Sequence, residues 1–137
     1  MAKLLIVDDQ AHVRKLVIAS VRKKGYCIFE AEDGLEALEI AVREAPDLVI
    51  LDFRLPHSGI DGGETARRLR GRVETRNCKI LMISGFMEMN AARAASLGAD
   101  DFMTKPFSPI RLRDRIDQLL NAISGNQSLT GESSKIS

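Results

Sequence analysis

Short apolar runs alternate five times along this chain with segments whose apolar residues recur every three to four positions. The runs, in chain order, are KLLIV, YCIFEA, DLVIL, KILMIS and DFMT, beginning at residues 3, 26, 47, 79 and 101. Three of them lack the alternation of a strand with one wet face, which is typical of strands covered on both sides. The pattern therefore predicts five strands of a buried parallel sheet.

The segments that follow these runs have the 3.6-residue period of amphipathic helices. Their apolar stripes extend, in chain order, over Val13–Val21, Leu35–Ala45, Ala66–Val73, Ala91–Gly98 and Leu112–Ile123. Two acid pairs at capping-box spacing, Asp33 with Glu36 and Asp61 with Glu64, indicate helix starts. A strand–helix alternation this regular predicts an α/β fold of the (βα)5 type with helices on both faces of the sheet. We assign it to the flavodoxin-like three-layer sandwich, with a five-stranded parallel sheet in the order 2-1-3-4-5.

Composition narrows the classes of protein that fit. The net charge is +1 over 137 residues, so no overall field attracts nucleic acid or a membrane surface, and we expect direct binding to neither. No run approaches the roughly 18 apolar residues of a membrane span, and Asp8 and Asp9 end the first run too early for a signal peptide. Cys27 and Cys78 match no metal or redox spacing, so we expect reduced thiols in a cytoplasmic protein.

The end of the chain differs in composition from the rest. Beyond Ile123 no apolar stripe continues, and serine and glycine become frequent. We expect one domain over residues 1–123 and a flexible tail or the start of a linker over residues 124–137.

Polar side chains gather where the predicted strands end. In chain order these are Asp8 and Asp9, then Asp52, Ser84, Thr104 and Lys105. The carboxyl ends of parallel strands meet at one edge, and clustered carboxylates there are favourable only with a cation, most suitably Mg²⁺. A lysine and a metal ion can hold a phosphoryl group, a hydroxyl can bond one of its oxygens, and a carboxylate can be the nucleophile. The sequence therefore predicts a Mg²⁺-dependent phosphoryl-transfer site.

Four motifs carry a resemblance to a known family. IVDD, LVILDFRLP, ILMISG and GADDFMTKPFSP occur in this order and with strand-sized spacing. Together they resemble the response regulator receiver domain of two-component signalling, over about residues 3 to 123. The resemblance implies a signalling switch, controlled by phosphorylation, which catalyses only its own phosphorylation and dephosphorylation.

The resemblance also implies roles for the acids. Asp52 is similar to the phospho-acceptor, which takes its phosphoryl group from the phosphohistidine of a sensor histidine kinase or a histidine phosphotransfer domain. Asp9 resembles the direct ligand of Mg²⁺, and Asp8 its partner through water. Asp52 and the backbone carbonyl of Arg54 would complete the metal ligands.

The remaining motif residues resemble those that pass the signal on. Ser84 matches the switch hydroxyl, Phe102 the aromatic switch residue, and Lys105 the lysine that pairs with phosphoryl oxygens. Family members usually have a cis peptide bond at the position of Lys105–Pro106. Phosphorylation would then change the surface of the fourth helix, fifth strand and fifth helix. That surface would contact a downstream protein or output domain, or a second copy of the chain in a homodimer.

One loop departs from the family pattern. The segment that follows Pro56, residues 57–62, looks about two residues longer than usual and borders the predicted site. Four arginines between Arg67 and Arg72 stand out as well, and we interpret them as a solvated helix face, with contact to nucleic acid as the minor alternative.

Two other functions compete with the signalling switch. A phosphatase of the haloacid dehalogenase type also uses a nucleophilic Asp, a hydroxyl, a lysine and a metal-binding acid pair. Its nucleophile follows the first strand, however, whereas here the acid pair comes first. A degenerate receiver that acts only as an interaction module is the other alternative, and it would bind neither Mg²⁺ nor beryllofluoride.

Overall fold

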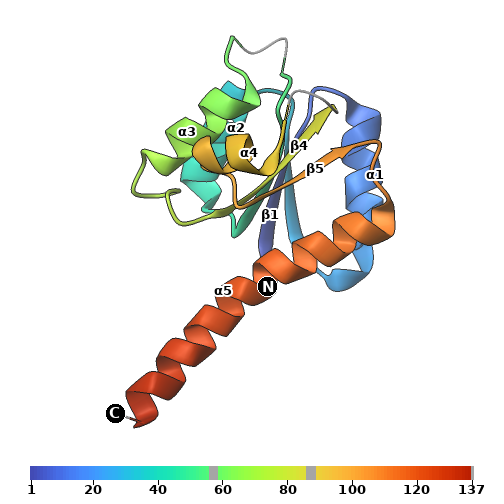
Figure 1. Ribbon diagram of the computed structural model, residues 1–137. Helices are drawn as coiled ribbons and strands as arrows, with labels where there is room; N and C mark the ends of the chain where they lie inside the picture. Colours follow the sequence, from blue (N-terminus) through green and yellow to red (C-terminus); the bar gives the residue numbers. More distant parts are fainter. Residues whose placement is uncertain (56–58, 86–88, 137) are drawn as a thin grey trace.

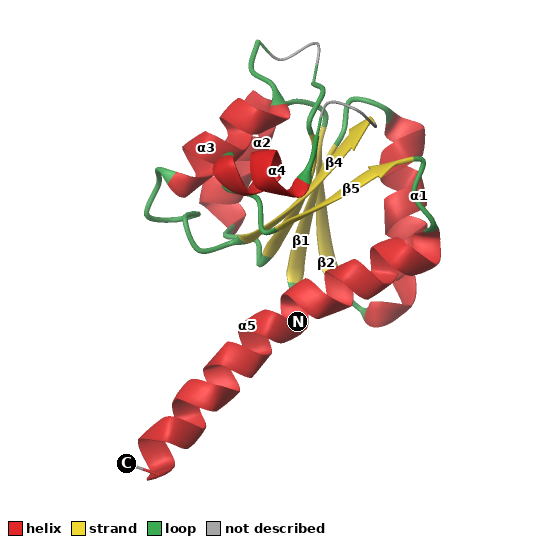
Figure 2. Ribbon diagram, in the orientation of Figure 1, coloured by secondary structure: helices red, strands yellow, loops and turns green. Residues whose placement is uncertain are grey.

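The computed structural model describes residues 1–55, 59–85 and 89–136, and at its centre lies a parallel sheet (Figures 1 and 2). The strands are β1 (Lys3–Val7), β2 (Cys27–Ala31), β3 (Leu48–Asp52), β4 (Lys79–Gly85) and β5 (Asp101–Lys105). They are hydrogen-bonded in the order β2-β1-β3-β4-β5. The predicted strand order and fold class are therefore confirmed, with each strand within two residues of its apolar run.

Helices cover both faces of this sheet. They are α1 (Ala11–Val21), a short 3-10 helix η1 (Arg22–Lys24), α2 (Gly34–Glu44), α3 (Gly62–Arg70), α4 (Ala91–Ser96) and α5 (Pro109–Ile136). One face packs on α1 and α5, and the other on α2, α3 and α4. This is the three-layer sandwich that the sequence predicts.

The core divides in two because neighbouring residues of a strand point to opposite faces. In β1, Leu4 and Ile6 join the cluster under α1 and α5, whereas Leu5 and Val7 join the cluster under α2 and α3. All five residues of β3 are buried, as expected for a central strand. Burial of each large apolar side chain contributes about 1.5–3 kcal/mol. This burial fixes the register of the strands and hence the positions of their carboxyl ends.

Side-chain caps start the helices nearest the carboxyl ends of the strands. Asp33 accepts a hydrogen bond from the backbone N–H of Glu36 at 2.8 Å, and Asp61 accepts one from Glu64 at 2.8 Å. Both predicted helix starts are thus confirmed. Asn90 caps α4 in the same way, through the N–H of Arg93, which the sequence analysis did not anticipate.

Three residues assigned to apolar helix stripes lie at the surface. Leu16 is 43% exposed, Leu35 52% and Val73 70%, so their predicted place in the core is wrong. For Val73 the reason is that α3 ends at Arg70, and a turn at Gly71 carries the chain off the helical path. Leu16 and Leu35 belong to helices whose buried stripe is narrower than their apolar stripe.

The amino end of the sheet holds a network centred on Arg70, the last residue of α3. Its guanidinium donates hydrogen bonds to the carbonyl oxygens of Gly98, at 2.9 Å, and of Arg76 and Cys78. It also pairs with the carboxylate of Asp100 at 2.8 Å, and Asp100 in turn accepts from the backbone N–H of Ile80 at 2.8 Å. One side chain therefore joins α3, β4 and the segment that leads into β5.

Helix α5 runs from Pro109 to Ile136 and extends beyond the body of the molecule (Figure 1). The domain boundary at residue 123 and the flexible tail or linker start expected over residues 124–137 stay predictions. Among the described residues, the helices lack the combined length and apolarity that crossing a membrane requires.

Candidate functional site

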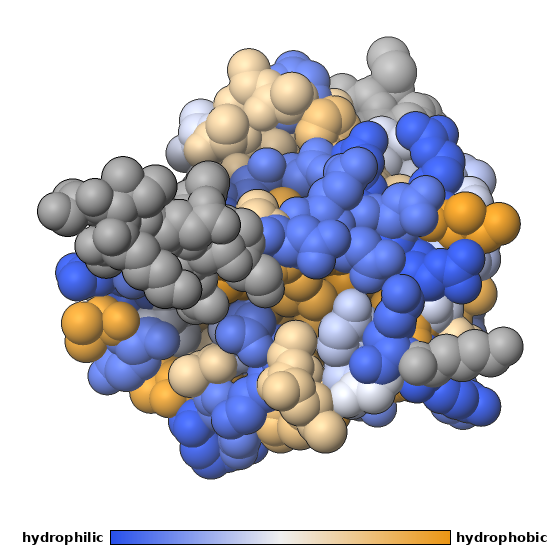
Figure 3. Space-filling model, turned by 90° about the horizontal axis from the view of Figure 1, so that it is seen from below, coloured by the Kyte–Doolittle hydropathy of each residue, from blue (hydrophilic) through white to orange (hydrophobic). Residues whose placement is uncertain are grey.

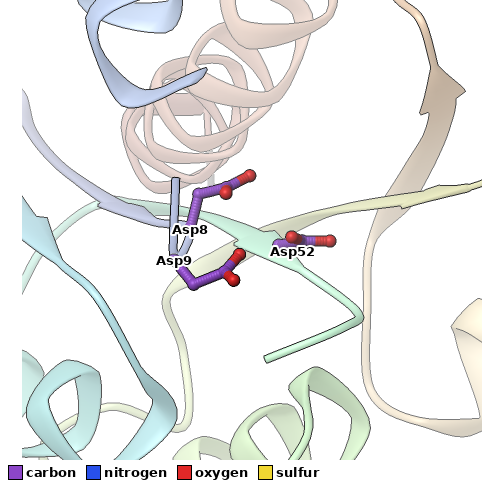
Figure 4. Close-up of side chains that lie close together, drawn as sticks. All are labelled: Asp8, Asp9 and Asp52. Atoms are coloured by element: carbon purple, nitrogen blue, oxygen red, sulfur yellow. The ribbon is translucent and has the colours of Figure 1, made fainter. Parts of the chain in front are cut away.

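Three carboxylates meet at the carboxyl ends of β1 and β3. Asp8, Asp9 and Asp52 each place a carboxylate oxygen within 4.8 Å of the other two. In Figure 4, the side chains of Asp8 and Asp9 both extend toward the side on which Asp52 lies. Asp8 and Asp52 are buried, with 4% and 5% of their surface exposed, whereas Asp9 is half-buried. The predicted acidic cluster therefore exists, and it is open to solvent mainly through Asp9.

Lys105 brings a positive charge to this cluster from the end of β5. Its ammonium group lies 3.1 Å from Asp8 Oδ2 and 3.1 Å from Asp52 Oδ2. These partners are 97 and 53 residues away in sequence, so the meeting depends on the strand order of the sheet. The peptide bond between Lys105 and Pro106 is cis, as the resemblance implies.

Backbone groups orient the two buried carboxylates. Asp8 Oδ1 accepts a hydrogen bond from the N–H of Gln10 at 2.9 Å, and Asp52 Oδ1 accepts one from the N–H of Arg54 at 3.2 Å. In each carboxylate, Oδ1 thus bonds backbone and Oδ2 faces Lys105. The side chains are held in place before any ligand arrives.

Burial and a neighbouring negative charge make Asp52 a weaker acid than an ordinary aspartate. Burial, followed by the neighbouring carboxylate of Asp8, raises the pKa of Asp52 to about 6, although Lys105 opposes this shift. For Lys105, burial alone would lower the pKa, but the charges of Asp52 and Asp8 outweigh it and raise the pKa. The lysine is therefore fully charged at neutral pH, and the site favours the arrival of further positive charge.

The predicted switch residues lie at the same edge of the sheet. Asp52 is paired with Ile83 in the sheet, so Ser84 follows at the carboxyl end of β4, where it is fully buried. Its hydroxyl donates to the carbonyl of Gly85 at 2.8 Å. Phe102 is half-buried and packs against the core under α2, α3 and α4.

The described part of the longer loop connects directly to the site. Gly62, the first residue of α3, donates its N–H to the carbonyl of Phe53 at 2.8 Å. A Cβ atom at Gly62 would stand 2.2 Å from the carbonyl oxygen of Asp52, so no other residue fits there without movement. Pro56 and His57 lie outside the described residues. The start of α3 is therefore fixed against the backbone of the predicted acceptor.

Arg14 belongs to the surroundings of the site, and the sequence analysis missed it. It is 9% exposed, and it donates to the backbone carbonyl of Asp8 at 2.8 Å and to Glu30 at 2.9 Å. It thereby ties the end of β1 to the edge strand β2. Its position could have indicated this, because Arg14 lies three residues before Val17 and therefore on the buried side of α1.

The donor set suits a magnesium ion. Carboxylate oxygens are hard ligands that Mg²⁺ and Ca²⁺ prefer, and the described residues near the cluster offer no thiolate or imidazole that would favour softer metals. A cation here would also compensate three negative charges that Lys105 alone leaves unbalanced.

Comparison with known proteins agrees with this geometry. A family model described as the response regulator receiver domain matches residues 4–117. The phosphate regulon transcriptional regulatory protein PhoB of Pseudomonas aeruginosa is 39% identical over 85% of this chain and 51% of its own length. Sporulation initiation phosphotransferase F of Bacillus subtilis is 37% identical over 86% of this chain and 93% of its own length. The chain thus spans about half of the first relative and nearly all of the second.

Solved structures give the same result. A putative response regulator from Chloroflexus aurantiacus superposes with a TM-score of 0.80 at 35% identity, covering 88% of this chain and 98% of its own. Chemotaxis response regulator CheY4 of Vibrio cholerae superposes with a TM-score of 0.79 at 29% identity, covering 87% and 98%.

Proposed function

The chain belongs to the family of response regulator receiver domains, whose function is phosphorylation-dependent signalling, and on this premise we propose that Asp52 is its phospho-acceptor. The donor is the phosphohistidine of a sensor histidine kinase or of a histidine phosphotransfer domain. The observation that supports this assignment most directly is that Lys105 contacts both Asp8 and Asp52 at 3.1 Å. The proposal places the switch in the cytoplasm.

The transfer requires little more than positioning and charge compensation. A carboxylate oxygen of Asp52 forms a bond to phosphorus while the bond from phosphorus to the imidazole nitrogen breaks, and that nitrogen keeps the electron pair. The ammonium group of Lys105, already 3.1 Å from Asp52 Oδ2, pairs with a phosphoryl oxygen. Because Asp52 Oδ1 is held by the N–H of Arg54, the acceptor is oriented before the donor binds.

The acids beside Asp52 hold the metal ion in this proposal. Asp9, the more exposed of the adjacent pair, would ligate Mg²⁺ directly, and Asp8 would do so through water. Asp52 and the backbone carbonyl of Arg54 would complete the protein ligands. When bound, Mg²⁺ supplies positive charge against the phosphoryl oxygens.

The signal then leaves through Ser84 and Phe102. The hydroxyl of Ser84, which donates to Gly85 in this structure, turns toward a phosphoryl oxygen, and Phe102 turns inward. Because both residues lie on β4 and β5, the change reaches the surface of α4, β5 and α5. That surface contacts an output domain, a downstream protein or a second copy of the chain.

The chain is not a member of a classical enzyme family, and its own phosphorylation is the reaction to measure. Incubation with acetyl phosphate and Mg²⁺, followed by intact mass measurement, should show the gain of one phosphoryl group. Asp52→Asn should show none, whereas the matched variant Asp114→Asn, on the exposed side of α5, should match the wild type.

Three outcomes would contradict the proposal. Labelling that persists in Asp52→Asn would refute the acceptor, and a wild type that binds neither Mg²⁺ nor beryllofluoride would be a degenerate receiver. Steady turnover of an added phosphate ester would support the phosphatase instead.

A further inference from the structure

The far end of α3 carries a concentration of positive charge that phosphoryl transfer does not use. Between residues 62 and 79, six cationic side chains stand against two carboxylates, which gives this segment a net charge of +4 in a chain of net charge +1. Helix α3 begins against the backbone of Asp52 and runs away from it, so its last turn lies toward the amino end of the sheet. In Figure 3, which views the molecule from below, hydrophilic side chains cover much of the middle of that end.

Three of these arginines surround a hollow between α2 and α3. It has a volume of about 380 Å³ and is lined by Leu38, Gly71, Arg67, Arg68 and Arg72. The three arginine side chains are 72%, 46% and 52% exposed, respectively. We call these three arginines, with Leu38 and Val73, the α3 basic patch.

Two carboxylates beside the α3 basic patch pair with its three arginines, and an incoming carboxylate could compete with them. Glu64 accepts hydrogen bonds from both Arg67 and Arg68, so one carboxylate faces two guanidinium groups. Arg72 lies 3.7 Å from Glu74, an exposed pair. Exposed ion pairs contribute little to stability, so a second carboxylate could engage these arginines without a large energetic penalty.

Apolar surface accompanies the charge. Val73, the residue after Arg72, is 70% exposed, and Leu38 contributes an apolar wall to the hollow. Arginines beside exposed apolar side chains are typical of protein interfaces, because a guanidinium group bonds carboxylates in a bidentate manner and stacks on apolar surface. A nucleic acid backbone would gain nothing from Val73, whereas a protein segment with apolar side chains would.

We propose that the α3 basic patch docks a segment of a partner protein that combines acidic and apolar side chains. The carboxylates of that segment pair with Arg67, Arg68 and Arg72. Its apolar side chains contact Leu38 in the hollow and Val73 next to Arg72. The patch lies at the end of α3 opposite Asp52, so docking there leaves the phosphorylation site accessible and does not depend on phosphoryl transfer.

A displayed library of random dodecapeptides tests the proposal, with selection on the full chain and counter-selection on Arg67→Gln/Arg68→Gln. Enriched peptides should carry a net negative charge together with apolar residues. In fluorescence anisotropy, the double variant should weaken their binding about tenfold and Val73→Ser should weaken it by about threefold. The matched variant Arg111→Gln/Arg113→Gln, which removes the same charge from α5 on the other face of the sheet, should bind like the wild type.

The opposite results would overturn it. These are enrichment of peptides without acidic excess, no enrichment over the double variant, or equal weakening by the α5 variant. If a short DNA duplex bound more tightly than the enriched peptides and this binding were lost in the Arg67→Gln/Arg68→Gln variant, the partner would be a nucleic acid and not an acidic protein segment. Unfolding of each variant in urea checks that the fold is retained, and peptide binding by Asp52→Asn separates this surface from the phosphorylation site.

Discussion

At the carboxyl end of the sheet three carboxylates face one ammonium group, whereas at the amino end one guanidinium group is surrounded by acceptors that match it. Lys105 cannot compensate Asp8, Asp9 and Asp52 together, and burial, followed by the charge of Asp8, raises the pKa of Asp52 despite the lysine. Arg70 instead bonds three carbonyls and Asp100, each at a position that the fold provides. A partly buried charge that is fully paired holds elements together, whereas a cluster left unbalanced attracts a ligand.

Removing the balanced charge should have the largest effect on stability. We expect Arg70→Met to lower the free energy of unfolding by about 2–4 kcal/mol, because it leaves the carbonyls of Gly98, Arg76 and Cys78 without this donor and removes the partner charge of Asp100. Urea denaturation measures this change. Arg72→Met, at an exposed position close by, should cost less than about 0.5 kcal/mol. Equal effects of the two substitutions would mean that the amino end gains no stability from its pairing.

Removing the charge of Asp52 from the carboxylate cluster should instead increase the stability of the fold. Because the pKa of Asp52 is raised from 3.8 to about 6, the folded state binds more protons than the unfolded state between these values, and its stability falls as pH rises through them. In EDTA at pH above 7, Asp52→Asn should therefore raise the free energy of unfolding by about 1–3 kcal/mol.

The pH and metal dependence sharpen this second prediction. The advantage of Asp52→Asn should shrink below about pH 6 and vanish only below about pH 3, where Asp52 is protonated in both states of the wild type. Saturating Mg²⁺ should reduce it as well, because the wild type then gains its missing cation. Thermal unfolding from pH 4 to pH 8 follows the effect, and a constant difference across this range would contradict the assigned cause.

Arg14 should show the smallest effect on stability, because it supports the cluster without belonging to it. Arg14→Met should cost about 1–2 kcal/mol, since Asp8 loses a donor to its carbonyl and Glu30 loses its partner. We also expect the Mg²⁺ affinity to fall about threefold, measured by calorimetry, because the end of β1 is less firmly held. The control Arg43→Met, at an exposed ion pair of α2, should leave Mg²⁺ affinity unchanged. A similar loss in that control would show that Arg14 has no special relation to the site.

The sequence predicted the strands and the meeting of Asp8, Asp9, Asp52 and Lys105 because both follow from simple rules. Continuous apolar runs indicate buried strands, and whatever follows parallel strands meets at one edge. Arg14 and Arg70 were not predicted, because they donate to backbone carbonyls outside their own helices. Helical periodicity signals that Arg14 is buried but does not identify such partners. Val73 was misplaced because helical periodicity alone does not show where a helix ends, and here the turn at Gly71 decided it.

The late position of Lys105 has a consequence for how the chain acquires its structure. During synthesis, Asp8 and Asp52 emerge well before Lys105, which contacts both of them in the folded chain. Over the same interval the edge of β4 is unpaired, because β5 has not yet emerged. The last strand therefore pairs with β4 and also brings the ammonium group of Lys105 to Asp8 and Asp52. Contacts between such distant segments slow folding. A nascent or truncated chain that stops before β5 would carry Asp8 and Asp52 without Lys105, and it would not function as a receiver domain.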